Sequence, residues 1–429
     1  MKQQIVHSSS PLRGDISVPG DKSISHRSIM LGSLASGTTE VHGFLQGKDS
    51  LATLLAFRGM GIGIEDLGGG RLRIEGRGLR GLQEPQDVID CGNSGTTMRL
   101  MMGLLAGQSF FSVLSGDRYL RRRPMKRVTV PLSAMGARIW GRCEGERAPL
   151  AIQGSALRPV RYDSPIASAQ VKSALLLAGL YADGETTVCE PHLSRDHSER
   201  MLKYFGATLR SFGGGVTMSG NPRLTGREVF VPADISSAAF FLVAALVVPG
   251  SELLIRNVGV NPTRSGIIDI LRAMGGSIEL LDARERSGEP VADLWVRSSS
   301  LRGIDISGGL VPRAIDEFPV ISVAASFAEG VTTIRDAEEL RVKETDRIQA
   351  MCDALNAVGG QVEDLEDGMR IVGQEQMRGG TVDSCGDHRI AMSMAVAALR
   401  CAAPVTVTDT ACTETSFPGF WSLLRQLAG

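Results

Sequence analysis

The sequence predicts an α/β protein of two lobes, each built from three similar units of helices and strands. Three observations predict this fold class. An apolar helical stretch that ends near Gly and continues into a strand recurs along the chain. A second junction from helix to strand follows most recurrences, and the last unit of the series is incomplete. With 429 residues, the chain is also long enough for two or three domains.

The first repeated segment joins the end of a helix to a strand. Gly suits the position after a helix, where φ is positive, and β-branched residues suit the strand that follows. The recurrences are LASGTTEVHG (34–43), LAGQSFFSVLSG (105–116), YADGETTVCEP (181–191), VVPGSELLIRNV (247–258), FAEGVTTIRDA (327–337) and RCAAPVTVTDT (400–410), of which the last lacks the Gly.

The second junction follows another helix and leads into further strands. It is found at MGIGI (60–64), MGARI (135–139), FGATL (205–209), MGGSI (274–278) and VGGQV (358–362). Together the two junctions predict two helices and several strands in each unit of roughly 70 residues, repeated about six times.

The sixth unit ends at Gly429 after its second helix, predicted over 417–427, and has no strand pair of its own. The N-terminal segment 3–18 is a plausible donor of those strands. We therefore expect one lobe formed by 1–19 plus 232–429 and another formed by 20–231. Hinge strands would pass between them near Pro19-Gly20 and Val231-Pro232. A single solenoid of six units is the alternative, but a globular composition and an incomplete last unit favour two lobes.

Composition argues against several classes of partner. The net charge of −1 gives no reason to expect binding to nucleic acid or to an acidic membrane. The most apolar stretch, 238–249, is too short to span a bilayer, and the N-terminus does not resemble a signal peptide. Seven scattered cysteines and six histidines show no spacing typical of disulfides or metal sites. We therefore expect a cytoplasmic protein with no metal and no cofactor.

Basic and small polar residues gather where helices of the 20–231 lobe are predicted to begin. Free N–H groups and the positive dipole end at a helix start suit an anion. Capped helices with solvated charges are the alternative. The segments are GDKSISHR (20–27), DCGNSGTTMR (90–99), SAQVK (168–172) and RDHSE (195–199), and a further segment, 118–127, holds six cations of which one or two are expected to point inward.

The other lobe combines basic residues with acids. In RVKETDR (341–347), Glu344 and Arg347 are three residues apart and are expected to share a helix face. A surface ion pair that contributes little is the alternative. Arg389 begins a helix, 390–399, that is apolar nearly all round and is therefore expected to be buried. Asp316 and Glu344 are the candidates for proton transfer.

Placement suggests what these segments bind. If the two lobes turn these helix starts toward each other, they create a positive chamber on a protein that is nearly neutral overall. The expected ligand is a small molecule with several negative charges. No P-loop, dinucleotide-binding GxGxxG or HExxH motif is present.

Five segments in this order resemble the 5-enolpyruvylshikimate-3-phosphate synthase family: GDKSISHR (20–27), GNSGTTMR (92–99), RRPM (122–125), RVKETDR (341–347) and GDHRIAM (386–392). The further segments SAQVK, RDHSE and NPTR (261–264) resemble its bacterial class II division. The resemblance implies the enolpyruvyl transferase fold, a two-lobed inverse α/β barrel of six βαβαββ repeats. It also implies transfer of the enolpyruvyl group of phosphoenolpyruvate to shikimate-3-phosphate, in the cytoplasm, by a monomer that needs no cofactor.

The resemblance assigns roles to matching positions. It places shikimate-3-phosphate against Lys22, Ser23, Arg27, Ser168, Ala169, Gln170, Arg195, Asp316 and Lys343. It places phosphoenolpyruvate against Lys22, Asn93, Gly95, Arg123, Gln170, Arg347 and Arg389. The implied catalytic groups are Lys22, Asp316, Lys343 and Glu344.

Two positions depart from the family pattern. Many relatives carry Lys near the C-terminal TFP motif, where this chain has Thr415. Many class II members have Ala where this chain has Gly95, which puts their tolerance of the inhibitor glyphosate in doubt here.

Two other functions compete with this prediction. The related transferase acting on UDP-N-acetylglucosamine has the same fold. Its first loop carries Lys-Asn, whereas this chain has Asp-Lys-Ser at 21–23. A non-catalytic repeat protein that binds polyanions would lack acids among its basic residues, whereas Glu344 lies inside a basic segment.

Overall fold

The structure is a computed structural model that describes residues 2–428 and divides into two compact units. The terminal unit consists of Met1–Pro19, Pro232–Arg284 and Pro290–Gly429, although Met1 and Gly429 themselves lie outside the described residues. The central unit consists of Gly20–Val231 with the short segment Glu285–Glu289. The main divisions fall at Pro19-Gly20 and Val231-Pro232, the positions at which the repeats suggest hinge strands.

The strands of residues 2–428 form six sheets, of which five have four strands and one has three. Sheet β6-β7-β9-β8 shows the common pattern, in which β6 (Ile89–Asp90) is parallel to β7 (Phe111–Ser115). β9 (Arg147–Gln153) is antiparallel to β7 and also to β8 (Arg138–Gly141). The same order recurs around the chain, which is consistent with the predicted six repeats.

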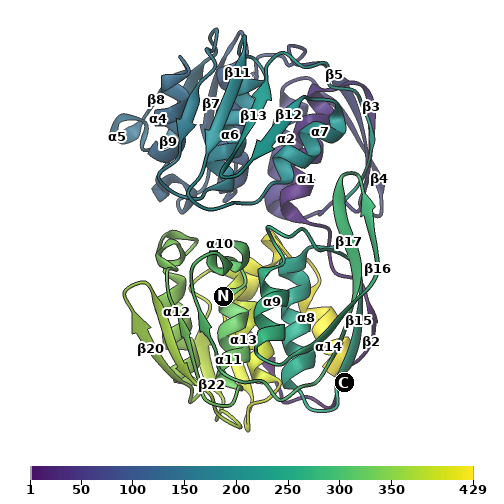
Figure 1. Ribbon diagram of the computed structural model, residues 1–429, viewed down its shortest axis with the longest axis vertical. Coiled ribbons are helices and arrows are strands. Elements are labelled where there is room, and N and C mark those ends of the chain that lie inside the picture. The colour runs from purple at the N-terminus through teal and green to yellow at the C-terminus, as the bar shows by residue number, and fades with distance from the viewer. Residues whose placement is uncertain (1, 429) are drawn as a thin grey trace. The chain divides into compact units, whose positions relative to one another are not determined.

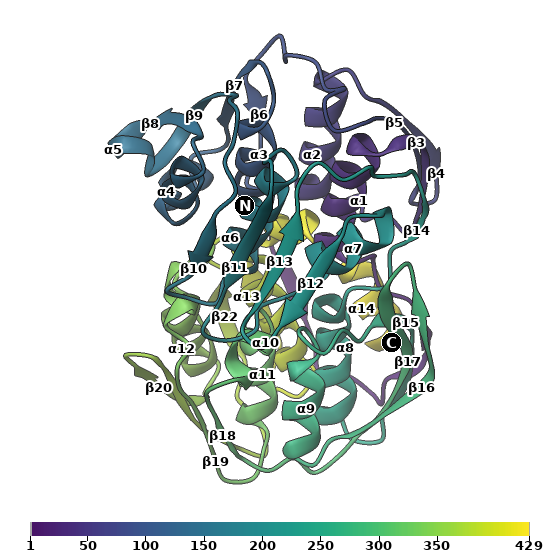
Figure 2. The ribbon, with the colours of Figure 1, turned by 45° about the horizontal axis from the view of Figure 1, so that its top comes forward.

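The central unit holds three of these sheets. Its further strands are β3 (Ser36–His42), β4 (Gly63–Gly68), β5 (Arg71–Arg77), β10 (Arg161–Asp163), β11 (Glu185–Cys189), β12 (Leu209–Phe212), β13 (Gly215–Ser219) and β14 (Glu228–Phe230). Its helices are α1 (Lys22–Leu34), α2 (Lys48–Gly59), α3 (Gly95–Ala106), the 3-10 helix η1 (Leu120–Arg122), α4 (Lys126–Ala134), α5 (Arg142–Gly145), α6 (Ala169–Gly179) and α7 (His197–Phe205). Figure 2 shows β10–β13 side by side and α1 beside β3–β5.

The terminal unit holds the other three sheets. Its strands are β1 (Gln4–Val6), β2 (Arg13–Ile16), β15 (Glu252–Gly259), β16 (Ser277–Arg286), β17 (Glu289–Arg297), β18 (Asp305–Ile306), β19 (Val331–Ile334), β20 (Gln361–Leu365), β21 (Gly368–Val372), β22 (Gly380–Asp383) and β23 (Val405–Thr408). Its helices are α8 (Ile235–Val247), α9 (Gly266–Ala273), α10 (Leu310–Ala314), α11 (Phe318–Ser326), the 3-10 helices η2 (Glu338–Val342) and η3 (Thr410–Thr415), α12 (Arg347–Ala357), α13 (His388–Ala398) and α14 (Phe420–Ala428).

The N-terminal segment contributes to two sheets, so the expectation that 3–18 supplies both missing strands of the last unit is only half correct. β1 pairs antiparallel with β23 and completes the three-stranded sheet. β2 instead lies parallel to β15 in another sheet. The reason is the shared sheet pattern, in which a strand at one edge of each four-stranded sheet runs parallel to its neighbour. β14 is this edge strand beside β3 in the central unit, and β2 is this edge strand beside β15 in the terminal unit.

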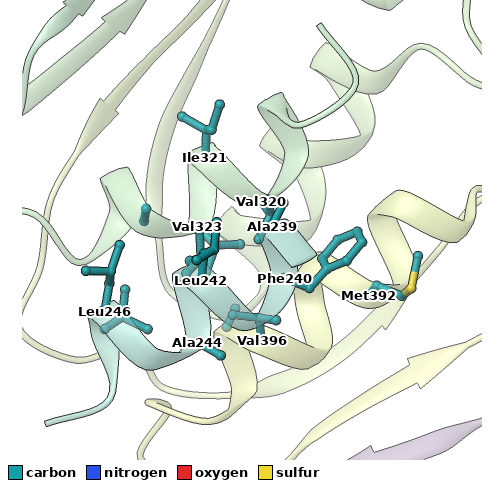
Figure 3. Close-up of a cluster of buried hydrophobic side chains, with 14 of the residues drawn as sticks. Ala239, Phe240, Leu242, Ala244, Leu246, Val320, Ile321, Val323, Met392 and Val396 are labelled. Carbon is teal, nitrogen blue, oxygen red and sulfur yellow. The ribbon is translucent and has the colours of Figure 1, made fainter. Parts of the chain in front are cut away.

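Buried helices fill the interior of each unit. In the terminal unit, α8, α11 and α13 lie together with sheets outside them (Figure 1), and their apolar side chains interdigitate, as Phe240, Val320 and Met392 illustrate (Figure 3). Every residue of α13 is buried, which confirms the prediction for the apolar stretch 390–399. In the central unit, a Cβ at Gly103 of α3 would lie 2.0 Å from the backbone oxygen of Ala174 in α6. That close approach of the two helices therefore requires Gly.

Within residues 2–428, no helix combines the length and the apolar character that crossing a membrane requires.

Candidate functional site

Three helices of the central unit begin at predicted site residues. α1 begins at Lys22, α3 at Gly95 and α6 at Ala169. The residue before each helix, Asp21, Ser94 or Ser168, accepts a hydrogen bond from a backbone N–H of the first turn. Other N–H groups of these first turns have no partner within the helix and are suited to anions. The predicted helix starts are therefore present, each with a side-chain cap.

Side-chain hydrogen bonds join these helix starts to one another. Arg99 of α3 donates from Nη1 to Gln170 Oε1 at 2.6 Å, and Gln170 Nε2 donates to Thr96 Oγ1 at 3.2 Å. From α1, Arg27 donates from Nη2 to Ser173 Oγ of α6 at 2.8 Å and from Nε to Ser198 Oγ of α7 at 2.7 Å. Hydrogen bonds from Arg27 of α1 and from Arg99 of α3 therefore both reach α6, at Ser173 and at Gln170.

The loop before α3 lies against two arginines. Arg123 Nη2 donates to Asn93 Oδ1 at 3.2 Å, and Asn93 Nδ2 donates to Asp117 at 2.9 Å. A Cβ at Gly95 would lie 2.9 Å from Arg99 Nη1 and 3.0 Å from Arg123 Nη1. Gly95 therefore leaves room for two guanidinium groups beside the N-terminus of α3.

Lys22 and Ser23 lie in the first turn of α1. Lys22 Nζ is 3.3 Å from Asp49 Oδ2 of α2, and both side chains are partly exposed. The backbone oxygen of Ser23 accepts a hydrogen bond from Arg27 Nη1 at 2.9 Å. Burial lowers the pKa of Arg27 to about 10, while the nearby Glu199 carboxylate acts in the opposite direction.

Behind these residues lies a buried ion cluster centred on Lys172. Its Nζ is 2.8 Å from Glu190 Oε2 and 2.9 Å from Glu199 Oε1, and no more than 7% of any of the three side chains is exposed. Burial alone would lower the pKa of Lys172, but the Glu199 and Glu190 carboxylates outweigh burial and raise it. For Glu199, burial outweighs the attraction of Lys172 and raises the pKa.

The ion cluster fixes two loops that carry predicted site residues. Glu190 accepts a hydrogen bond from the backbone N–H of Ser168 at 3.0 Å and from the Ser194 hydroxyl at 2.7 Å. Lys172 Nζ donates to the backbone oxygen of Ser194 at 3.3 Å. Ser168 and the half-buried Arg195, which follows Ser194, are therefore held from behind by the same cluster.

In the terminal unit, Arg347 is surrounded by carboxylates. Its side chain is 1% exposed, and it donates to Asp387 at 2.8 Å, Glu344 at 2.7 Å and Asp316 at 3.3 Å. Burial would lower the pKa of Arg347, but Asp387, Glu344 and Asp316 outweigh burial and raise it. This is a buried ion network, and the alternative of a weak surface pair does not apply.

Asp316 lies at the centre of the same network. Its carboxylate is 3.8 Å from Lys343 Nζ, 3.9 Å from Arg389 Nη2 and 3.7 Å from Arg264 Nη1. Arg389 Nη1 also donates to the Asp316 backbone oxygen at 2.9 Å. The predicted residues Asp316, Lys343, Glu344, Arg347 and Arg389 therefore meet in one cluster.

One local expectation is wrong. Glu344 and Arg347 do not share a helix face, because η2 ends at Val342 and α12 begins at Arg347. Asp346 caps α12 by accepting from the N–H of Gln349, so the helix begins at the next residue and Glu344 lies outside it. The two side chains meet nonetheless, with Arg347 Nη2 lying 2.7 Å from Glu344 Oε2.

Sequence reasoning gave no role to several charged residues of these clusters, among them Arg99, Lys172, Arg264 and Asp387. Arg99 and Lys172 are single charges within otherwise apolar helices, at 4% and 2% exposure, and such isolated charges predict a buried partner. Asp387 caps α13 by accepting from the N–H of Arg389, so its cap position could be read from the sequence, but its contact with Arg347 could not. Arg264 donates to Ser236 Oγ at 2.6 Å, and the two residues are 28 positions apart, so no local sequence pattern reveals this contact.

Thr415 does not replace the Lys of many relatives with another charge. Its hydroxyl donates to the Cys412 backbone oxygen at 2.7 Å and closes the end of η3. Among residues 2–428, no group of three or more His, Cys, Asp or Glu side chains is placed to hold a metal ion.

Comparison with known proteins places the chain in a family. The family model described as EPSP synthase (3-phosphoshikimate 1-carboxyvinyltransferase) matches residues 6–424. The chain is 67% identical over 426 residues to the 3-phosphoshikimate 1-carboxyvinyltransferase of Syntrophotalea carbinolica, covering 99% of both proteins. It is 66% identical over 427 residues to that of Geotalea uraniireducens, covering 100% of this chain and 99% of the relative.

Solved structures give the same result. An EPSP synthase from Acinetobacter baumannii is 46% identical, with a TM-score of 0.90, and the match covers 99% of this chain and 98% of the other. The predicted α/β fold class is thereby confirmed. From the residues matched and the identities found, the chain belongs to the EPSP synthase family.

Proposed function

We propose that this chain transfers the enolpyruvyl group of phosphoenolpyruvate to the 5-hydroxyl of shikimate-3-phosphate and releases phosphate. Relatives at 64–67% identity that are named 3-phosphoshikimate 1-carboxyvinyltransferase support this activity over transfer to UDP-N-acetylglucosamine. The observation that carries the chemistry is the cluster in which Asp316, Lys343 and Glu344 meet around Arg347. A protein that only binds polyanions has no use for acids paired in this way.

The central unit, 20–231, is the proposed shikimate-3-phosphate lobe. Lys22, Ser23 and Arg27 would bind this substrate from α1, and Ser168, Ala169 and Gln170 from the start of α6. Arg195 would complete the set. The support is that Arg27 joins α1, α6 and α7 through hydroxyl groups, while Lys172 holds the loops of Ser168 and Ser194. Cationic and hydroxyl groups preorganised in this way suit a phosphate and its neighbouring hydroxyls.

Phosphoenolpyruvate would be bound at two groups of residues. Asn93, Gly95, Arg123 and Gln170 would hold its phosphate, helped by Lys22. The free N–H groups at the start of α3 and the guanidinium of Arg123 support this assignment. Arg347 and Arg389 would hold its carboxylate. Because Arg347 already contacts three carboxylates, the substrate would compete with Glu344, which at 29% exposure is the most accessible of them.

The reaction needs an acid that later acts as a base. C3 of phosphoenolpyruvate gains a proton, the 5-hydroxyl oxygen attacks C2, phosphate leaves, and a C3 proton is then lost. Glu344 would move the proton at C3, while Asp316 or Lys343 would accept the proton of the 5-hydroxyl. Lys22 and the arginines would stabilise the negative charge on the departing phosphate.

The other unit, 1–19 plus 232–429, is the proposed second lobe, which carries both termini and the proton-transfer groups. We further propose that the enzyme works as a monomer in the cytoplasm. The cysteines within residues 2–428 are all free thiols, which supports a reducing compartment. Analytical ultracentrifugation with and without both substrates tests the monomer, and a stable dimer would contradict it.

The decisive experiment mixes the purified chain with phosphoenolpyruvate and shikimate-3-phosphate and follows phosphate release. The expected result is phosphate release that requires both substrates. Release with UDP-N-acetylglucosamine in place of shikimate-3-phosphate would favour the related transferase. Binding of both compounds without any release would favour the non-catalytic alternative.

A further inference from the structure

Four buried side chains form a chain of hydrogen bonds through the first three helices of the central unit. His26 Nδ1 of α1 is 2.7 Å from Thr53 Oγ1 of α2, and Thr53 Oγ1 is 2.8 Å from Thr97 Oγ1 of α3. Thr97 Oγ1 donates to Ser94 Oγ at 2.7 Å. Each of these residues is at most 1% exposed. The chain ends at the residue that caps α3.

The direction of the last hydrogen bond fixes the direction of the others. A hydroxyl group has one proton to donate. Thr97 donates its proton to Ser94, so it must accept from Thr53. Thr53 then has no further proton for His26, so the ring must donate from Nδ1–H. The hydroxyl chain therefore selects one tautomer of His26.

The other ring nitrogen supports the same tautomer. His26 Nε2 is buried and has no hydrogen-bond partner. An unpaired buried acceptor is less costly than an unpaired buried N–H donor, so the proton belongs on Nδ1. Burial, with the nearby cations Lys22 and Arg27, lowers the pKa of His26 well below its ordinary value and keeps the ring neutral.

The capped helix start is the proposed phosphate site. Ser94 Oγ accepts from the backbone N–H of Thr97 at 3.1 Å, so its position sets the first turn of α3, where Gly95 lies. We propose that His26, as the neutral Nδ1–H tautomer, is a positioning residue that orients Ser94 and the N-terminus of α3 for the phosphate of phosphoenolpyruvate. This inference rests on the proposed function for its kinetic consequence but not for the state of the ring.

Nitrogen NMR of the histidine rings tests the tautomer directly. The expected spectrum of the intact chain shows His26 as a neutral ring protonated at Nδ1 at pH 7. The signal is assigned as the one missing in His26→Asn or, if that variant does not fold, by single replacement of the other five histidines. A ring protonated at Nε2, or at both nitrogens, would overturn the inference.

Thr97→Val tests the positioning role, because it keeps the shape of the side chain and interrupts the chain of hydrogen bonds between Thr53 and Ser94. Misplacement of a bound group by about 1 Å can lower the reaction rate by up to about 10²-fold. A smaller shift here should raise the KM for phosphoenolpyruvate on the order of 10-fold. The KM for shikimate-3-phosphate should change less than about 2-fold. The His26 signal should also broaden or shift toward a mixture of tautomers.

Thr186→Val is the matched control. Thr186 is fully buried in β11 of the same unit, and its Oγ1 has no hydrogen-bond partner, so this variant should leave both KM values unchanged. Equal rises in both KM values for Thr97→Val, or no rise in either, would refute the positioning role. If the intact chain releases no phosphate from its two substrates, the proposed function fails. In that case the NMR spectrum still tests the tautomer of His26. The positioning role is then tested by the dissociation constant of inorganic phosphate instead of the KM for phosphoenolpyruvate.

Discussion

One buried arginine of each unit, Arg27 in the central unit and Arg347 in the terminal unit, is balanced in a different way. In the central unit, the guanidinium of Arg27 donates to the hydroxyls of Ser173 and Ser198 and to a backbone oxygen. In the terminal unit, the guanidinium of Arg347 donates to the carboxylates of Asp387, Glu344 and Asp316. Both arginines are buried, so solvent accounts for little of the difference.

This difference separates binding from proton transfer. Hydroxyl partners orient a cation without cancelling its charge, which leaves that charge to act on an anionic ligand. Carboxylate partners offset the charge and place acids directly beside the cation. The central unit is therefore better suited to hold a phosphate, and the terminal unit to move protons.

Removing the charge of Glu344 tests this division most strongly. Glu344→Gln should lower turnover by about 10²–10⁴-fold, because proton transfer at C3 is lost. Substrate affinity should persist, since Arg347 keeps its contacts with Asp387. Phosphate release at saturating concentrations of both substrates measures the turnover number.

Glu339→Gln is the control for this change. Glu339 is also an acid near Lys343, at 3.9 Å, but it has no ion pair with Arg347, so turnover should stay close to that of the intact chain. Should Glu344→Gln keep more than about a third of normal turnover, Glu344 is only a structural partner of Arg347.

Replacing Lys172 tests the buried charges behind the binding residues. Lys172→Met should lower the free energy of unfolding by about 3–5 kcal/mol, because Glu190 and Glu199 would be left as buried carboxylates without a cation. Urea unfolding followed by circular dichroism measures this loss. The double variant Lys172→Met, Glu199→Gln should recover part of it, since one unpaired charge is removed.

The exposed Lys203 of α7 provides the control. Lys203→Met should change the free energy of unfolding by less than about 0.5 kcal/mol. A loss of similar size in both variants, or no recovery in the double variant, would show that the Lys172 cluster is not what stabilises these loops.

The sequence predicted individual positions better than their partners. The starts of α1, α3 and α6 follow from local cap and turn residues, and the structure shows these helices beginning within the predicted segments. Partners that come from distant parts of the chain, such as Glu190 for Lys172, depend on how the sheets and helices assemble. β2 illustrates the same limit, because its own residues give no sign that it pairs with β15. Short-range sequence patterns therefore predict where helices and strands lie, whereas the partners of buried charges depend on how each whole unit packs.

Gly95 tests how closely the central unit fits its proposed phosphate. In Gly95→Ala, the new methyl group would push on the ends of Arg99 and Arg123. Glyphosate, which in this family extends beyond phosphoenolpyruvate in the same pocket, should lose more affinity than the substrate. One misfitting methyl group is worth about 10–200-fold in discrimination. The inhibition constant of glyphosate and the KM for phosphoenolpyruvate, measured for both forms, give this ratio.

Gly59→Ala is the matched control, because a Cβ at Gly59 in α2 meets nothing within 4 Å. It should leave both constants unchanged. Equal losses of inhibitor and substrate affinity in Gly95→Ala would mean that the methyl group disturbs the whole loop and does not act selectively on the longer ligand.

Mild acid should act on the central unit through His26. Its folded-state pKa lies well below 6.5, because burial and the cations Lys22 and Arg27 disfavour the charged ring. As pH falls, the His26 ring therefore takes up a proton in the unfolded chain before it does so in the folded chain. The free energy of unfolding should then decrease as pH falls below about 6.5. The contribution of this one group approaches about 1.4 kcal/mol per pH unit until the folded ring also titrates.

Urea unfolding at several pH values between about 6.5 and 5 measures this slope. His26→Asn should reduce it, whereas His7→Asn, at an exposed position, should leave it unchanged. An equal slope in the intact chain and in His26→Asn would mean that the ring takes up its proton in the folded state as easily as in the unfolded state. The chain of hydroxyl groups would then not depend on a neutral His26 ring. The contrast between the two units would rest only on the partners of Arg27 and Arg347.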